Sequence, residues 1–97
     1  MAASSGGRPK LIFAFSPESG PCRHAEGFLA QVLQHRANHE TFELHRLDVL
    51  AQPRLAETLD VVSVPSLLVV VDGEIAGRLE QPTGVKQFRE FLAPWLR

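Results

Sequence analysis

Two short runs of consecutive apolar residues stand out along the chain, at Leu11–Phe15 and Leu67–Val71. Each run is apolar at every position, which predicts a strand that is covered on both faces. Pro9 and Pro17 flank the first run, and Pro65 precedes the second. Because proline interrupts regular strand pairing, these runs are expected to begin and end close to the prolines and to form the centre of a sheet.

Apolar residues recur at intervals of three and four in three other segments, which predicts three helices. These helices are expected over residues 22–36, 53–59 and 83–96. Leu55 is expected to face inward from the second helix, and Thr83 to cap the third. The predicted core takes side chains from strands and helices alike: Phe13, Phe28, Val32, Leu67, Val69, Phe88 and Leu92.

Two further strands complete the pattern, over residues 42–49 and 75–80. The second of them follows Asp72-Gly73, which is the strongest hairpin-turn signal in the chain. The predicted order is therefore β-α-β-α-β-β-α, with the first two strands parallel because such crossovers are right-handed. We predict an α/β domain over residues 10–97, with three layers and a four-stranded mixed sheet, after a flexible tail over residues 1–9.

Composition narrows the classes of function. The chain has 97 residues, of which 44% are hydrophobic and 22% charged, as is typical of one globular domain. Its 10 basic and 11 acidic residues give a net charge of −1, so electrostatic binding to nucleic acid or to an anionic membrane is not expected. No apolar run approaches the roughly 20 residues that span a bilayer, and no signal peptide is visible. We expect a cytoplasmic monomer without a cofactor.

The single cysteine stands in the segment Ser19-Gly20-Pro21-Cys22, between the first strand and the first helix. One cysteine excludes an intrachain disulfide, and it excludes a zinc site built from several cysteines of this chain. The N-terminus of a helix presents free amide N–H groups, which favour the thiolate form of a cysteine. Arg23 and His24 would strengthen this effect wherever they face the sulfur.

The segment Ser19-Gly20-Pro21-Cys22 resembles the Cys-Gly-Pro-Cys motif of thioredoxins, with the first cysteine replaced by serine. Val64-Pro65 stands before a buried strand, where thioredoxins carry a cis-proline that faces the active-site loop. Residues 67–80 are similar to the thioredoxin hairpin, and residues 84–96 are similar to its last helix. The resemblance implies a minimal thioredoxin-like fold, without the strand and helix that thioredoxins place before the active-site strand.

Three positions depart from the thioredoxin pattern. Thioredoxins attack a disulfide with their first cysteine, and the hydroxyl of Ser19 cannot form a disulfide. Glu18 replaces the tryptophan before the motif, and Phe13 replaces the buried acid that transfers protons in thioredoxins. Turnover with two cysteines is therefore excluded for this chain. An engineered Ser19 would account for one of these departures but not for all three.

Two roles remain open for Cys22, and they decide whether the chain is an enzyme. In the first, Cys22 is a structural residue packed as a small hydrophobe, in a domain that binds a protein or peptide without redox turnover. In the second, Cys22 is the centre of a monothiol oxidoreductase and forms a mixed disulfide with glutathione or a partner protein. The three departures favour the first role.

The resemblance also implies a groove for a peptide. In thioredoxin-like folds the backbone beside the cis-proline pairs with an extended segment of a partner. The groove predicted here has Gly20 and Pro21 on one side and Val64 and Pro65 on the other. Without a covalent step, such a small contact supports an affinity that is roughly micromolar or weaker.

Other chemistry has less support in the sequence. The four histidines, His24, His35, His39 and His45, are not spaced with a carboxylate or cysteine as metal ligands are. Ser19 lacks the Gly-x-Ser-x-Gly surroundings of a hydrolase nucleophile. We therefore expect neither a metal site nor a serine hydrolase.

Overall fold

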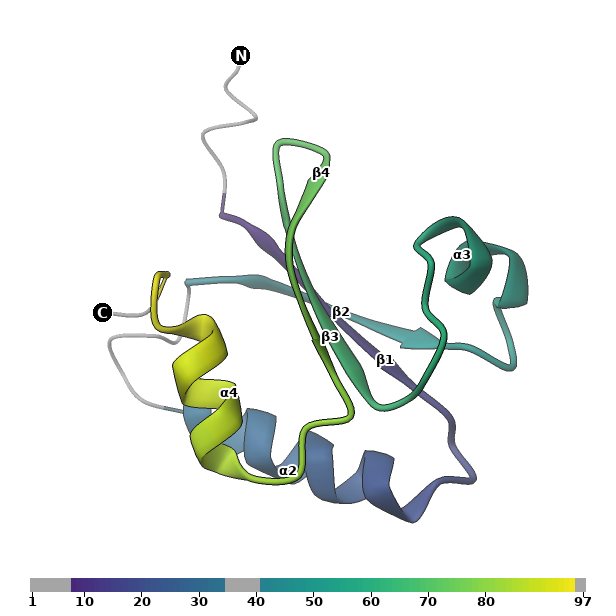
Figure 1. The fold of residues 1–97 in the computed structure, drawn as a ribbon, viewed down its shortest axis with the longest axis horizontal. Coiled ribbons are helices and arrows are strands. Elements are labelled where there is room, and N and C mark those ends of the chain that lie inside the picture. Colours follow the sequence, from purple (N-terminus) through teal and green to yellow (C-terminus); the bar gives the residue numbers. More distant parts are fainter. Residues whose placement is uncertain (1–7, 35–40, 96–97) are drawn as a thin grey trace.

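A computed structural model of the chain describes residues 8–34 and 41–95. Most of the predicted tail, together with His35 and His39, lies outside these ranges. The elements follow each other as β1 (Lys10–Phe15), α2 (Gly20–Leu33), β2 (Glu43–Asp48), α3 (Pro53–Thr58), β3 (Ser66–Val71), β4 (Glu74–Glu80) and α4 (Val85–Leu92) (Figure 1). The predicted α/β fold class and element order are confirmed.

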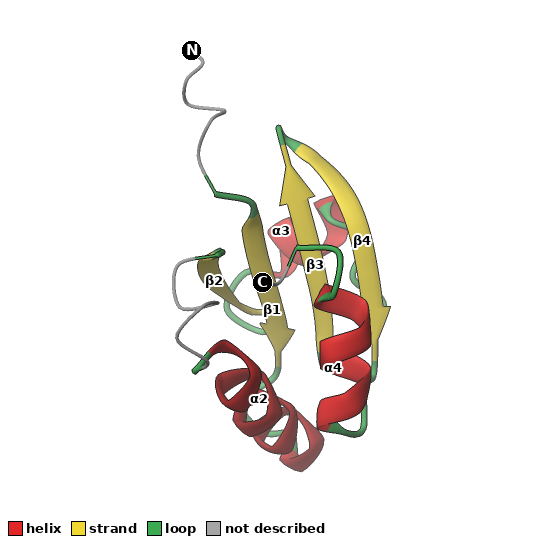
Figure 2. Ribbon diagram, turned by 90° about the vertical axis from the view of Figure 1, so that its left-hand side faces the viewer, coloured by secondary structure: helices red, strands yellow, loops and turns green. Residues whose placement is uncertain are grey.

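The four strands form one mixed sheet in the order β2-β1-β3-β4. β1 is parallel to β2 and antiparallel to β3, and β3 is antiparallel to β4. The two uninterrupted apolar runs therefore form the two central strands, as predicted. Figure 2 shows α2 and α4 on one face of the sheet and α3 on the other, which gives the three layers.

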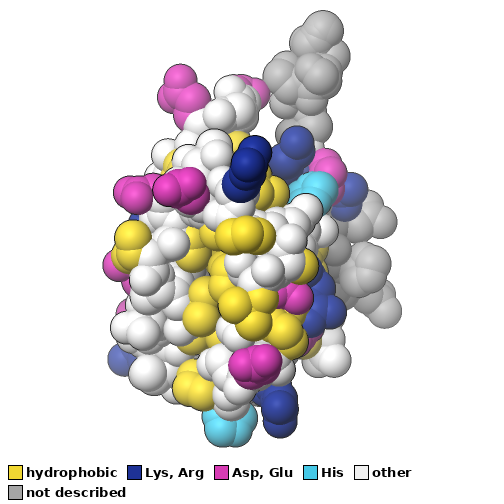
Figure 3. Space-filling view, turned by 90° about the vertical axis from the view of Figure 1, so that its right-hand side faces the viewer, with side chains coloured by type: hydrophobic (Ala, Val, Ile, Leu, Met, Phe, Trp, Pro, Cys, Tyr) yellow, Lys and Arg dark blue, Asp and Glu magenta, His cyan; other side chains and the backbone are white. Residues whose placement is uncertain are grey.

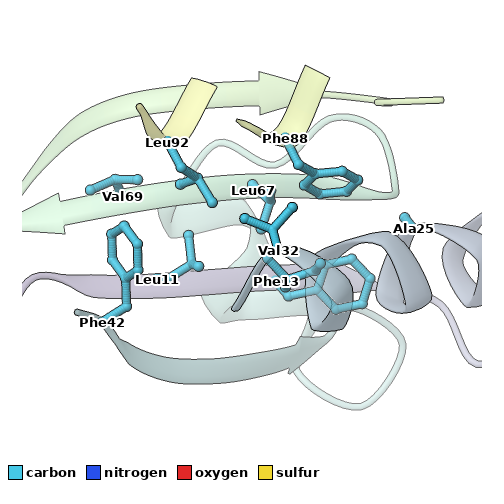
Figure 4. Packing of buried hydrophobic residues seen from close by; sticks show 10 residues of the cluster. Leu11, Phe13, Ala25, Val32, Phe42, Leu67, Val69, Phe88 and Leu92 are labelled. Atoms are coloured by element: carbon cyan, nitrogen blue, oxygen red, sulfur yellow. The ribbon is translucent and has the colours of Figure 1, made fainter. Parts of the chain in front are cut away.

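The main core lies between the sheet and the pair of helices α2 and α4. Figure 4 shows side chains from both helices meeting those of β1 and β3 in one apolar layer. Every predicted core residue is buried except Phe28, which is half-buried and packs against the same cluster. A smaller cluster of Ala14, Leu47 and Ala56 lies between the sheet and α3.

Side-chain caps shift the starts of two helices from their predicted positions. α2 begins at Gly20 because the Ser19 hydroxyl accepts a hydrogen bond from the Cys22 amide at 3.2 Å. The predicted cap at Thr83 is wrong, since Gly84 is the N-cap residue of α4. The amide oxygen of Gln87 accepts hydrogen bonds from the N–H groups of Thr83 and Gly84, and thereby takes over the capping.

The expectation that Leu55 faces inward is also wrong, because this side chain is 43% exposed. The six residues of α3 make fewer than two turns, and Ala56 and Leu59 already occupy the side that faces the sheet. Leu55 instead lines a shallow groove beside α3, together with Ile12 and Val70. Figure 3 shows hydrophobic side chains gathered in the middle of the face on which α3 lies.

The hairpin between β3 and β4 turns at Asp72-Gly73, as predicted. Both residues have positive φ, 53° and 83°, as a two-residue hairpin turn of the type I′ class requires. Farther along β4, Gly77 lies under the ring of Phe91, where an added Cβ would be 3.1 Å from a ring carbon. The indole of Trp95, just beyond α4, packs against Phe91 and Phe42 with ring centroids 6.3 and 6.4 Å apart.

Candidate functional site

The loop from β1 to α2 is a tight turn held by its own backbone. The Ser19 amide donates to the Ser16 carbonyl at 3.1 Å, and the Glu18 amide donates to the Ser16 hydroxyl at 3.3 Å. The turn leaves Ser19 half-buried as the helix cap, with Gly20 and Pro21 exposed in the first turn of α2. The position of the attacking cysteine in thioredoxins is thus occupied by a serine whose hydroxyl caps α2.

Cys22 lies in the first turn of α2, as predicted, but its side chain is only 2% exposed. Its sulfur accepts a hydrogen bond from the Ser16 amide at 3.4 Å, which ties the helix start to the end of β1. Arg23 and His24 are exposed on the surface of the helix. The sulfur is therefore shielded from solvent and already engaged by the backbone.

Val64 and Pro65 lie at the same end of the sheet as this loop. Ser66, the first residue of β3, is opposite Ala14 near the end of β1, so Pro65 lies beside the start of the β1–α2 loop (Figure 1). The Val64–Pro65 peptide bond is cis. Pro65 is buried and offers no apolar surface of its own, contrary to the groove expected from the sequence, whereas Val64 is half-exposed.

The loop that carries Val64 is fixed from several directions. The Arg78 guanidinium donates to the carbonyls of Leu59 and Asp60 at 2.7 and 2.8 Å, which anchors the start of the loop to β4. The Gln81 amide donates to the Pro65 carbonyl at 2.7 Å, which anchors its end. Within the described part of the chain, the N–H and C=O of Val64 make no hydrogen bond to another backbone group, so the anchored loop leaves one backbone pair without a backbone partner.

Phe13 and Glu18 stand where thioredoxins carry the buried acid and the tryptophan. Phe13 is 1% exposed, and its ring stacks on that of Phe15 with centroids 5.8 Å apart. A buried phenyl ring at this position can neither accept nor donate a proton. Glu18 is exposed in the turn. Nothing in this pair of positions can assist a thiol–disulfide exchange in the way that the thioredoxin residues do.

Sequence reasoning missed Val62 as part of this surface. Its side chain is 76% exposed in the loop before Val64, more than any other large hydrophobic residue described. The available signal was the pair Val61-Val62, which stands between Asp60 and Ser63 outside any helical or strand periodicity. An exposed valine two residues from Val64 adds to the apolar surface of this loop.

The described residues hold neither a group of metal ligands nor a membrane-spanning helix. Among residues 8–34 and 41–95, no three histidine, cysteine or acidic side chains are grouped as a metal site would need. His24 and His45 lie on different elements, α2 and β2. In the same ranges, no helix has the length and apolar character needed to cross a membrane.

The sequence model of the family described as Thioredoxin matches residues 4–94 of the chain. The chain belongs to the thioredoxin family. It is 31% identical over 75 residues to the thioredoxins of Mycobacterium tuberculosis and Mycobacterium bovis. This alignment covers 77% of the chain and 63% of the mycobacterial proteins, so the chain spans less than two thirds of the length of these thioredoxins.

Solved thioredoxin structures share the fold at lower identity. Trxlp from Edwardsiella tarda superposes with a TM-score of 0.81 at 17% identity, over 98% of this chain and 88% of that one. Thioredoxin from Fasciola hepatica gives a TM-score of 0.79 at 19% identity, over 96% and 86% of the two chains. The family match and this shared fold together make the chain a thioredoxin-like domain related to thiol redox proteins.

Proposed function

We propose that this chain is a thioredoxin-fold binding module that holds an extended segment of a partner protein without redox turnover. The observation that carries the proposal is the state of its one cysteine. Cys22 is 2% exposed and its sulfur accepts a hydrogen bond from the Ser16 amide, while the other end of the motif carries only the half-buried hydroxyl of Ser19. The proposal places the protein in the cytoplasm, where a single thiol remains reduced.

The partner would bind where the β1–α2 loop meets the loop before β3. An extended segment can pair with the free N–H and C=O of Val64, as in other cases of strand addition, while its side chains contact Val62 and Pro21. Because Arg78 and Gln81 already hold the loop in place, binding costs the loop little conformational entropy. The contact is small, so we expect an affinity of roughly micromolar or weaker.

A second candidate function is a monothiol exchange through Cys22. In it, the Cys22 thiolate attacks glutathione disulfide, forms a mixed disulfide with one glutathione and releases the other as a thiolate. The position of Cys22 in the first turn of α2 favours this chemistry, since amide N–H groups point toward that end of the helix. Its burial opposes it, because the sulfur has to become accessible before it can attack.

The two functions are separated by capturing partners from a lysate with four immobilised chains. These are the unmodified chain, Val64→Asp, Cys22→Ala and Ile75→Asp, the last being a matched control because Ile75 is 40% exposed on β4, away from the loops. We expect Val64→Asp to lose the captured proteins, and Cys22→Ala and Ile75→Asp to keep them. Val62→Asp serves as a second site variant, since a side chain that is 76% exposed can change without affecting the core.

Two outcomes would contradict the binding module. If Cys22→Ala loses the partners and the complexes of the unmodified chain resist denaturant until a reductant is added, the monothiol function is correct. If Val64→Asp and Val62→Asp, both folded, capture the same proteins as the unmodified chain, this surface is not the binding site.

A further inference from the structure

Three exposed acidic residues lie in the segments that meet at Val64, and each comes from a different segment. Glu18 is in the turn between β1 and α2, Asp60 begins the loop that leads to Val64, and Glu80 ends β4. Among residues 8–34 and 41–95, none of these three side chains forms an ion pair with a basic side chain. The described structure therefore leaves their negative charges unpaired.

The sheet places Glu80 on the face that carries the loop before β3. Arg78 and Glu80 are two residues apart in β4, so their side chains lie on the same face of the sheet. This is the face with α3, because the Arg78 guanidinium donates to the carbonyls of Leu59 and Asp60 just after that helix. Glu80 is opposite Ser66, the first residue of β3, so its carboxylate lies beside the end of the loop.

Glu18 lies on the other side of the same loop. β1 and β3 are antiparallel with Ala14 opposite Ser66, so the residues that follow β1 lie beside those that precede β3. Glu18 is exposed in this turn, where its amide donates to the Ser16 hydroxyl. Because β3 lies between β1 and β4, Glu18 and Glu80 flank the loop from opposite sides.

Arg23, the basic residue nearest to the motif, is directed away from this surface. It follows Pro21 by two residues in α2, so the two side chains lie about 200° apart around the helix. Glu26 is about 60° from Arg23 around the helix, and its carboxylate pairs with the Arg46 guanidinium of β2 at 2.8 Å. The charge of Arg23 therefore lies on the β2 side of α2, whereas Pro21 faces the other side.

Other basic residues of the neighbouring elements already have partners. The Arg78 guanidinium is engaged by two backbone carbonyls, and Lys86 of α4 forms an ion pair with Glu90 at 4.0 Å. Arg54 of α3 is followed three residues later by Glu57, a spacing at which side chains are neighbours on a helix surface, so their charges offset each other. The surface around the loop is therefore acidic.

We propose that the partner segment is basic, with lysine or arginine beside the apolar residues that contact Val62 and Val64. This inference rests on the proposed function and names the chemical class of its partner. Complementary charges across an interface decide which partner binds more than how tightly it binds. Carboxylates on several sides of one apolar contact select a basic segment among extended apolar segments, and they repel an acidic one.

Selection from a displayed library of random peptides tests this charge preference. Two immobilised chains are compared, the unmodified chain and one with Val62→Ser and Val64→Ser, which removes the apolar contacts without adding a charge. Peptides that are enriched on the first chain but not on the second bind at this loop. We expect lysine and arginine to be at least about twofold more frequent in them than in the unselected library.

Removing the three carboxylates tests their role directly. In a chain with Glu18→Gln, Asp60→Asn and Glu80→Gln, the excess of basic residues among the enriched peptides should disappear. The matched control is Asp72→Asn with Glu74→Gln, two exposed acidic residues in the hairpin at the opposite end of the sheet, and it should keep the excess (Figure 1). Asp60 and Asp72 both have positive φ, 58° and 53°, a conformation that asparagine adopts readily.

The affinity of one enriched peptide provides a second measure. Amide NMR shifts of Val62 and Val64 report binding at the loop. Replacing the basic residues of the peptide by glutamine should weaken its binding by about tenfold at low ionic strength. In about 0.5 M NaCl the two peptides should differ by less than about twofold, because salt screens exposed charges.

This inference and the proposed function fail in different ways. Enriched peptides that depend on Val62 and Val64 but carry no excess of lysine or arginine overturn the basic partner and leave the binding module standing. An excess that persists after the three carboxylates are removed also overturns it. If no peptide in the library depends on Val62 and Val64, the binding module itself is wrong.

Discussion

Ser19 caps α2 and Cys22 lies in its first turn, and the side chain of each accepts a hydrogen bond from a backbone amide. The Ser19 hydroxyl accepts from the Cys22 amide, and the Cys22 sulfur accepts from the Ser16 amide. In this arrangement the hydroxyl stabilises the start of the helix, a role for which serine is among the best residues. The sulfur fills a position between the helix and the end of β1, so both residues contribute to folding.

The burial of Cys22 predicts a slow reaction with thiol reagents. In the folded chain we expect labelling to be at least about 100-fold slower than after unfolding in guanidinium chloride, because the sulfur is reached only through local opening. The control is a chain with Cys22→Ala and Glu18→Cys, which moves the one thiol to an exposed turn and should react rapidly when folded. Equal labelling rates for the two folded chains would show that Cys22 is accessible and would favour the monothiol function.

Single residues differ in how much of their role the sequence reveals. The absence of a second thiol and the loss of the buried acid at Phe13 are properties of residue type, so the sequence excluded two-cysteine turnover. The burial of Pro65 depends on segments that are distant in the sequence, since Ala14 is opposite the next residue, Ser66, and the Gln81 amide donates to the Pro65 carbonyl. The burial of Cys22 depends on how the loop between β1 and α2 turns, since the Ser16 amide donates to its sulfur. The exposure of Val62 depends in the same way on where its loop is anchored.

The sequence predicted the secondary-structure elements correctly where a side-chain pattern extends over a whole strand or helix. The uninterrupted run Leu67–Val71 predicted a central strand, and Asp72-Gly73 predicted its turn. Errors occurred where a single residue was decisive. Leu55 was expected to be buried because the pattern does not state which side of so short a helix faces the sheet, and Ala56 and Leu59 take that side. The cap of α4 was assigned to Thr83 because the Gln87 side chain that caps it lies four residues farther on.

Replacing glycine by alanine should change the free energy of unfolding in opposite directions at two positions. Gly73→Ala should lower the free energy of unfolding by about 1 kcal/mol, because a side chain is strained at its φ of 83°. Gly27→Ala should raise it by about 0.5–1 kcal/mol, since Gly27 is inside α2 and an added Cβ meets no described atom within 4 Å. Urea denaturation of both variants measures the two changes, and a common sign would contradict these assignments.

The molecule as a whole keeps the thioredoxin-like fold while the reaction centre has changed. The main core between the sheet and helices α2 and α4 is complete without any cysteine pair or buried acid. The element order sufficed to predict this architecture, because alternation of strands and helices allows few arrangements. The identity of the partner is not contained in the order of elements, because it depends on the loops at one end of the sheet.

The missing second thiol predicts the behaviour of the whole protein in a turnover assay. The unmodified chain should not reduce insulin disulfides in the presence of dithiothreitol above the rate of the reductant alone, since nothing resolves a mixed disulfide. Ser19→Cys restores a dithiol, but its rate should remain at least about 100-fold below that of a mycobacterial thioredoxin measured in parallel, because Phe13 cannot transfer a proton. Comparable rates for the unmodified chain and that thioredoxin would contradict the binding module.

The packing of Trp95 against Phe42 and Phe91 has an optical consequence. The chain has one tryptophan and no tyrosine, so its near-ultraviolet emission comes almost entirely from this indole. The indole packs at the end of the core near the start of β2, whereas Val64 lies beyond the carboxyl end of β1. Unfolding separates the indole from both phenyl rings and shifts its emission to the red, while a peptide bound at Val64 leaves it unchanged. The protein thus contains a spectroscopic reporter that distinguishes loss of folding from loss of binding.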